Sequence, residues 1–308
     1  MRKPTLFVAV ACLVGVTPVF AQPPMSNGVW HVRGDNGEIV HVLPNPASAE
    51  AFEHRFGIQQ PPSRINNYSV FSPSYGANPG QMNDHGGAVV SNAAFLPIFY
   101  NAATAASLQS GIDAMVNSFS NSDPGMKVIT QYSKTGNAIS AALTHSPDLV
   151  DNQPAPRRIS DSGVQNYLTG LFNSGRITAT TNTVYGVYLP QGTTSTLGSA
   201  RSCTSYCGYH SSYTYSGKTI LYAVFPYNDC SGCSLSGKTV LDMETIVTSH
   251  EIREAITDPV NAWWESSSGY EDDDKCAWHN LYQQPGGAWV QPEYSNALAG
   301  WPRGCVTP

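Results

Sequence analysis

The sequence predicts an α+β protein whose main domain spans residues 86–308. Segments rich in β-branched and aromatic residues alternate there with segments of helical periodicity. A helix that carries histidine and glutamate follows the last predicted strand. The chain of 308 residues is long enough for one large domain with a substantial core.

The first 21 residues are typical of an export signal. Arg2 and Lys3 form a basic head, residues 6–19 are apolar, and Val19-Phe20-Ala21 is a small-x-small cleavage site. We therefore expect a secreted protein, extracellular or periplasmic, that begins near Gln22. A retained anchor is the alternative, but the apolar run is short for a membrane span.

Residues 22–85 differ in character from the main domain. Residues 29–33 and 38–42 alternate on either side of Asp35-Asn36-Gly37, which predicts a β-hairpin. A short helix over residues 47–56 and a Pro/Ser/Asn/Gly-rich linker over residues 59–87 follow. This segment is either a pro-region that is later removed or an accessory subdomain.

The predicted elements of the main domain are assigned from periodicity. Strands are expected at residues 88–100, 126–132, 183–189 and 219–225, and helices at residues 104–119, 162–172 and 242–257. Pro259 ends the last helix.

Six cysteines remain after the signal, which carries Cys12, and all lie in the final third of the chain. An even number in an exported protein favours disulfides, so this third is expected to be stapled by Cys203, Cys207, Cys230, Cys233, Cys276 and Cys305. Pairing neighbours in the sequence would join Cys203 to Cys207, Cys230 to Cys233, and Cys276 to Cys305. A zinc site made by the first four is the alternative.

The charge of the chain argues against two classes of partner. Without Arg2 and Lys3, 14 basic residues stand against 22 acidic ones, a net charge of about −8. Nucleic acids and anionic membranes require a basic surface, so neither is an expected partner. We expect a monomer.

The segment His250-Glu251-Ile252-Arg253-Glu254 is the strongest functional signal. It resembles the zinc-protease helix motif with the second histidine replaced by glutamate. His250 and Glu254 lie one above the other on a helix, about 6 Å apart along its axis, as metal ligands require. Glu251 is then placed to take a proton from a metal-bound water. The motif implies a zincin-like mixed sheet with a metal-site helix.

The apolar stripe of the same helix leads to these residues. Met243, Ile246 and Val247 continue through His250 to Glu254, so two ionisable groups occupy the side that faces the core. A buried carboxylate costs several kcal/mol unless it is paired or binds a metal. The alternative to a metal is an internal network in which His250, Arg253 and Glu254 neutralise one another.

A third ligand is expected from the acidic run at residues 271–274. We predict Glu271 and Asp274 as metal ligands and Asp258 as a group that supports them. The ion is expected to be Zn²⁺, although oxygen-rich ligation also suits calcium or manganese. An exposed acidic loop is the alternative. For His210 we expect a structural role beside the cysteine loop.

The second half also resembles the secreted plant family EXORDIUM, or phosphate-induced protein 1. The resemblance is carried by Cys203-Thr-Ser-Tyr-Cys207-Gly-Tyr-His210, a following strand, and Cys230-Ser-Gly-Cys233, and it covers roughly residues 86–280. Bacterial relatives with Ser-His-Glu-x-x-Glu-Ala-x-Thr-Asp-Pro are closer. Aligned on Cys276, their acidic segment falls on Glu271 and Asp274. The resemblance implies secretion, disulfides and one α+β domain.

Two functions follow from these observations. The first is a secreted zinc-dependent hydrolase, a peptidase that cleaves peptide or protein substrates with metal-activated water. The second is a non-enzymatic, EXORDIUM-like extracellular module that associates with cell-wall polysaccharide and holds a structural ion in the same residues.

Overall fold

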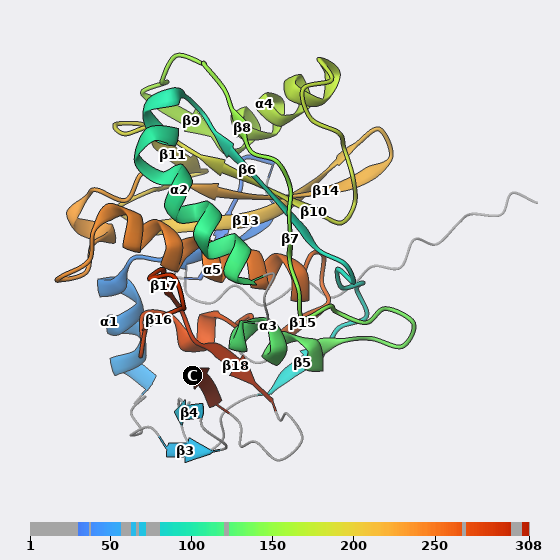
Figure 1. Cartoon of the computed structure of the whole chain (residues 1–308), viewed down its shortest axis with the longest axis vertical. Helices are drawn as coiled ribbons and strands as arrows, with labels where there is room; N and C mark the ends of the chain where they lie inside the picture. The colour runs from blue at the N-terminus through green and yellow to red at the C-terminus, as the bar shows by residue number, and fades with distance from the viewer. Residues whose placement is uncertain are drawn as a thin grey trace, which may run out of the picture.

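An eight-stranded mixed sheet organises the computed structural model, which describes residues 30–36, 38–56, 63–65, 68–71, 81–119, 123–266, 269–296 and 304–307 (Figure 1). The strand order is β1-β2-β13-β14-β10-β6-β7, with β8 also beside β6. The strands are β1 (His31–Arg33), β2 (Ile39–Pro44), β6 (Ala94–Phe99), β7 (Thr144–His145), β8 (Leu149–Val150), β10 (Thr183–Tyr188), β13 (Tyr206–Tyr215) and β14 (Lys218–Phe225).

The central strands β14, β10 and β6 are parallel, and β13, β2 and β1 continue the sheet with antiparallel pairing. All six residues of β10 are buried, as in a parallel strand covered on both faces. The predicted mixture of strands and helices is therefore confirmed.

Helices cover both faces of this sheet and enclose two cores (Figure 1). Helices α2 (Ala102–Phe119) and α5 (Val240–Thr257) contribute to one core, with Ile112 and Val247 among its members. Helix α4 (Asp161–Asn173) contributes Val164 and Leu168 to the other. Residues of β10 alternate between the two cores, as strand geometry requires.

Small sheets and short helices complete the fold. The sheets are β9 (Arg158–Ser160) with β11 (Thr194–Leu197) and β12 (Ala200–Arg201); β5 (Met82–Asp84) with β15 (Trp263–Glu265); β16 (Tyr282–Gln283) with β17 (Trp289–Val290); and β3 (Ser63–Ile65), β4 (Tyr68–Phe71), β19 (Gly304–Thr307) and β18 (Glu293–Ser295). The remaining helices are α1 (Pro46–Phe56), α3 (Pro124–Ile129), η1 (Thr130–Tyr132), η2 (Ser231–Cys233) and η3 (Asp274–Cys276).

Strands of the N-terminal segment pair with strands of the main domain. The predicted hairpin forms, and its second strand β2 pairs with β13 in the central sheet. Strands β4 and β5, which fall within the predicted linker, pair with β19 and β15 from the C-terminal third. The predicted signal, residues 1–21, lies outside the described residues.

One predicted strand is wrong. Residues 126–132 form α3 and η1 instead. Asp123 caps α3 by accepting a hydrogen bond from the Met126 backbone amide, and Pro124 occupies the first turn. Residues 88–90 also lie outside the strands, and β13 was not predicted from periodicity.

Three disulfides staple the C-terminal third as expected, but two pairings differ from the sequence-local ones. The bonds are Cys203–Cys230, Cys207–Cys233 and Cys276–Cys305. The loop before β13 and the loop after β14 meet because these strands form an antiparallel hairpin, so each cysteine pairs across it. All four cysteines of the alternative zinc site are therefore used in disulfides.

Helix α5 begins and ends where its sequence signals predict. Thr239 and Asp242 form a reciprocal capping box, and Asp258 is the C-terminal cap before Pro259. The helix is buried on all sides from Met243 to Thr257, and not along a single stripe. Gly208 on β13 permits its close approach, because a Cβ there would clash with Val247 and lie 3.0 Å from the Glu251 carboxylate.

We expect Gly208→Ala to lower the free energy of unfolding by roughly 1–3 kcal/mol, since the added methyl must push α5 from β13. Gly170→Ala is the matched control, because no atom lies within 4 Å of its Cβ position. That helical substitution should be neutral or stabilise by up to about 1 kcal/mol. Denaturant unfolding of both variants measures the difference, and equal midpoints would contradict the proposed contact.

Candidate metal centre

Helix α5 brings His250, Glu251 and Glu254 to a buried site beside the sheet. The loop at residues 271–274 approaches from the other side, so the predicted ligands Glu271 and Asp274 lie near His250 and Glu254. His250, Glu254, Glu271 and Asp274 are each at most 3% exposed. The acidic run is therefore not an exposed loop.

The first ligand group consists of His250, Glu254 and Asp274. The Nε2 atom of His250 lies 3.0 Å from Glu254 Oε2 and 3.7 Å from Asp274 Oδ1. All three ligand atoms lie within 4.8 Å of one another. Zinc ligands with bonds of about 2.1 Å in a tetrahedron lie about 3.4 Å apart, so these separations suit a shared ion.

Backbone amides fix the carboxylates of this group. The Asp274 amide donates to Glu254 Oε1 at 3.0 Å, and the Glu271 amide donates to Asp274 Oδ2 at 3.0 Å. Each carboxylate thus has one oxygen held by the backbone and the other directed at His250. Such orientation by surrounding groups is typical of metal ligands.

Neither ring nitrogen of His250 has a hydrogen-bond partner, although the side chain is fully buried. The short approach of Nε2 to Glu254 Oε2 therefore lacks hydrogen-bond geometry. Two lone pairs that converge on one point, without a proton aligned between them, are the arrangement expected of metal ligands.

Sequence reasoning missed a second group of side chains around His210. On β13, His210 lies with Nδ1 3.2 Å from Glu251 Oε2 and Nε2 3.4 Å from Glu271 Oε2. His210 thus contacts the acids of the site. These contacts differ from the structural role beside the cysteine loop that the sequence suggested. His210, Glu254 and Glu271 form a second group whose ligand atoms all lie within 4.8 Å.

His41, brought by the N-terminal hairpin, lies next to His210. The two residues are register partners on β2 and β13, and His31 is the partner of His41 on β1. His41 Nδ1 approaches Glu271 Oε1 to 2.8 Å. In the sequence, His31, His41 and His210 are isolated histidines. They point to a common site only when the pairing of their strands β1, β2 and β13 is known.

Burial controls the ionisation of these groups. It raises the pKa of Glu251, Glu254, Glu271 and Asp274 well above the usual range, and neighbouring carboxylates add to the effect. Burial lowers the pKa of His210 to about 3. The imidazole is therefore uncharged near neutral pH, as a metal ligand must be.

Asp258 lies next to the predicted ligand Glu271. It caps α5 and accepts a hydrogen bond from the Ala262 amide. Its carboxyl also hydrogen-bonds Glu271, and burial raises its pKa to about 7.

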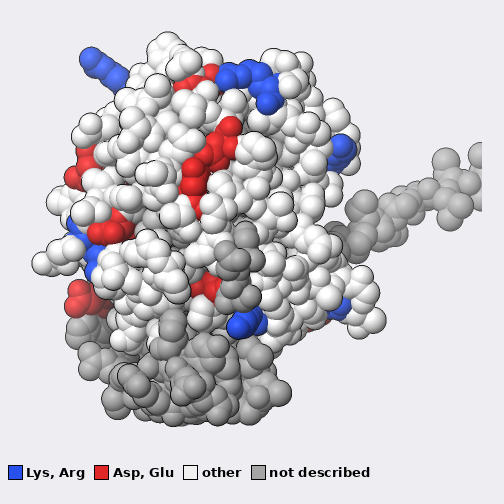
Figure 2. All heavy atoms as spheres, in the orientation of Figure 1, with Lys and Arg blue, Asp and Glu red and all other residues white. Residues whose placement is uncertain are grey.

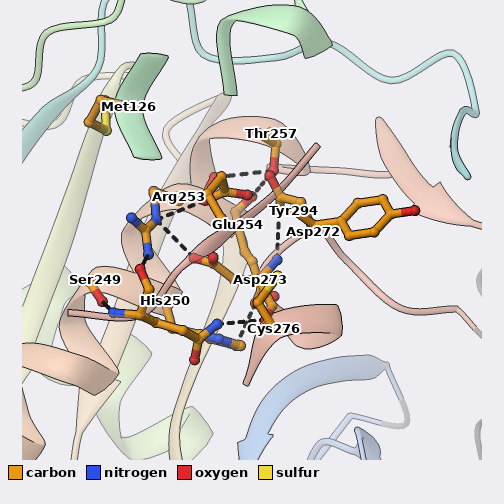
Figure 3. Close-up of polar contacts among 12 residues, drawn as sticks. Met126, Ser249, His250, Arg253, Glu254, Thr257, Asp272, Asp273, Cys276 and Tyr294 are labelled. Atoms are coloured by element: carbon orange, nitrogen blue, oxygen red, sulfur yellow. Dashed lines mark hydrogen bonds and ion pairs between the residues drawn. The ribbon is translucent and has the colours of Figure 1, made fainter. Parts of the chain in front are cut away.

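Arg253 neutralises a different set of acids. Its guanidinium lies 3.0 Å from Asp273 (Figure 3). It also lies 2.8 Å from Glu293 and 3.6 Å from Asp123, and it donates to the Gln291 carbonyl. No ion pair joins it to Glu254. Among the described residues, the ion pairs of Glu251, Glu254, Glu271 and Asp274 involve only histidines. The alternative network with Arg253 therefore does not form.

A pocket of about 200 Å³ opens onto one side of the site. His41, His210, Asp258 and Glu271 line it, together with residues 259–261. His250, Glu254 and Asp274 do not line it. The His210–Glu271 side of the site therefore faces the pocket, whereas the first ligand group lies deeper.

A further group, Asp113, His145 and Asp148, also has ligand spacing. It is only partly buried, and both ring nitrogens of His145 contact hydrogen-bonding partners, Asn117 and Asp148. His145 is therefore held by protein partners, whereas Asp113 Oδ1 has no hydrogen-bond partner.

Comparisons with family profiles, curated proteins and solved structures found no match for this chain. The resemblance to the EXORDIUM family thus stays a prediction. Among the described residues, no helix is long and apolar enough to cross a membrane. On the face shown in Figure 2, the basic side chains lie as small separate groups on a largely uncharged surface.

We expect Arg253→Gln to destabilise the protein by about 3–5 kcal/mol, because it leaves Asp273 and Glu293 buried without their cation. Lys134→Gln is the control, since the carboxylate that this lysine pairs with, Asp84, is 46% exposed. Its loss should cost no more than about 1 kcal/mol. Chemical denaturation separates the two, and a small effect of Arg253→Gln would contradict the assigned pairing.

Proposed function

We propose that this protein is a secreted, metal-dependent hydrolase, a peptidase with a zincin-like helix that uses metal-activated water. One observation carries the proposal: His250, Glu254 and Asp274 converge in a buried site, and backbone amides hold the outer oxygens of both carboxylates. These acids have no Lys or Arg ion-pair partner among the described residues. A divalent cation would supply the missing positive charge.

The donor set fits zinc, with calcium or manganese as alternatives. One imidazole and two carboxylates are ligands that zinc accepts, and a bound zinc lowers the pKa of a coordinated water. In this proposal His250, Glu254 and Asp274 hold the ion, while Glu271 lies beside them with an oxygen that has no hydrogen-bond partner.

Glu251 is assigned the role of proton acceptor. Its Oε2 lies 3.2 Å from His210 Nδ1, within hydrogen-bond distance, and its Oε1 has no hydrogen-bond partner. Burial raises the pKa of this carboxyl, which makes its ionised form a stronger base. The pocket of about 200 Å³ has room for one side chain of a peptide or protein substrate.

Secretion is supported by the export signal in the sequence and by the three disulfides. Disulfides persist in oxidising compartments and are rare in the cytoplasm.

A second candidate is an extracellular module that associates with cell-wall polysaccharide and holds a structural ion. The complete burial of His250 and the near-complete burial of Glu254 favour it, because a catalytic ion needs an open position. The two candidates share the metal and differ in hydrolysis.

Purified full-length protein should retain zinc through dialysis, and the metal should raise the melting temperature. Glu254→Gln should weaken metal binding by more than about 100-fold, because a ligand is lost and not merely a neighbour of one. Asp113→Asn, in the partly exposed acidic group, is the matched control and should bind as wild type. Elemental analysis and competition with a chelator measure both, and a wild-type protein without metal would refute the proposal.

Glu251→Gln should abolish cleavage of casein or a peptide library while the metal stays bound, since glutamine keeps an acceptor for His210 but cannot take a proton. We expect at least a 100-fold lower rate. Glu244→Gln, at another buried glutamate of α5, is the control and should retain the rate. Equal cleavage by Glu251→Gln and wild type would end the assignment as a peptidase. Metal without any hydrolysis in wild type would favour the structural module.

A further inference from the structure

We propose that the site holds two cations, with a second position between His210, Glu254 and Glu271, next to the first position that the proposed function assigns to His250, Glu254 and Asp274. Glu254 belongs to both groups and would bridge the two ions. The second position deepens the proposed function, because it places a metal at the pocket.

The spacing of the imidazoles favours two ions over one. Two ligand atoms that are each about 2.1 Å from an ion are no more than about 4.2 Å apart. The candidate ligand atoms form two groups, and within each group all ligand atoms lie within 4.8 Å of one another. His210 and His250 belong to different groups. Glu254 belongs to both groups, and its Oε2 lies 3.0 Å from His250 Nε2. A shared carboxylate is typical of sites in which two metal ions lie about 3.5–4 Å apart.

The orientation of His210 supports a ligand at its far nitrogen. His210 Nδ1 lies 3.2 Å from Glu251 Oε2, and in the tautomer whose proton is on Nδ1 this contact leaves the lone pair of Nε2 available to an ion. Nε2 faces Glu271 Oε2 at 3.4 Å, and that oxygen is buried without a hydrogen-bond partner. A carboxylate that holds one ring nitrogen while the other binds a metal is a common arrangement around metal-bound histidine.

The N-terminal hairpin positions the second group. His41 Nδ1 lies 2.8 Å from Glu271 Oε1 without hydrogen-bond geometry, so the hairpin packs an imidazole against this carboxylate on the pocket side. The hairpin is anchored on both sides of the sheet, since Leu43 and Trp30 belong to one core and Val40 to the other. Trp30 also packs edge-on against Tyr270, next to Glu271. His41 is thus a positioning residue from a segment far away in sequence.

The pocket distinguishes the two positions. His210 and Glu271 line it, while His250 and Asp274 do not. Water, chelator and substrate would reach the second ion directly and the first only past it. The outer metal ion should therefore exchange faster than the inner one. Two metal ions at the base of the pocket would polarise a substrate carbonyl that enters it.

Metal counting on the full-length protein tests this proposal. With zinc, wild type should bind two equivalents, one removed quickly by a chelator and one slowly. His210→Ala should bind one equivalent, which leaves slowly. His41→Ala should keep two, with the outer ion bound about 10-fold or more weakly. His85→Ala, at a histidine stacked on Trp264 outside both groups, is the control and should match wild type.

Each remaining outcome overturns the proposal in a distinguishable way. One equivalent in wild type that persists in His210→Ala means that the second position does not exist. One equivalent that His210→Ala abolishes means a single ion bound by both histidines. No metal at all refutes the proposed function itself. With manganese, magnetic coupling between two ions should appear in the electron paramagnetic resonance spectrum of wild type and vanish in His210→Ala. Circular dichroism confirms that each variant is folded.

Discussion

Negative charge buried around the C-terminal half of α5 is the constraint on which the rest of the site depends. The helix is enclosed from Met243 to Thr257, so its acids cannot rely on water. Carboxylates in such surroundings need a matching positive charge or a proton. Arg253 supplies the charge to Asp273 and Glu293 on one side. On the other side Glu251, Glu254, Glu271 and Asp274 have only imidazoles as ion-pair partners, and burial holds the pKa of His210 at about 3. The acids on one side of the helix are thus matched by Arg253, while those on the other side have no Lys or Arg ion-pair partner among the described residues.

The fold brings these groups together from segments that are distant in sequence. β2 and β13 place His41 and His210 side by side, and α5 crosses β13 closely because position 208 is glycine. The 271–274 loop is held by its own amides and is followed by Cys276, which is bonded to Cys305. Cys207–Cys233 fixes the start of β13 to the segment that leads into α5. Rigid neighbours of this kind keep ligand atoms at fixed separations before any ion arrives.

Local patterns in the sequence predicted what depends on neighbouring residues. The Asp35-Asn36 turn, the limits of α5, and the one-turn spacing of His250 and Glu254 all follow from short-range geometry. Contacts between distant segments were harder to predict. The pairing of β2 with β13 decides that His41 and His210 meet, and no periodicity encodes that partnership. The first two disulfides depend on the β13–β14 hairpin in the same way. At α3, a helix-capping aspartate and a proline outweighed the β-branched residues that suggested a strand.

The pairing of β2 with β13 has a consequence for the fate of the chain's first part. If proteolysis were to detach residues 22–85, β13 would become the border of the central sheet, with its outward amides and carbonyls bare. An unpaired edge strand of this kind pairs with strands of other molecules and promotes association. The same cut would open both hydrophobic cores, which lose Trp30, Leu43 and Val40. Loss of this segment would therefore leave a remainder that is prone to aggregate.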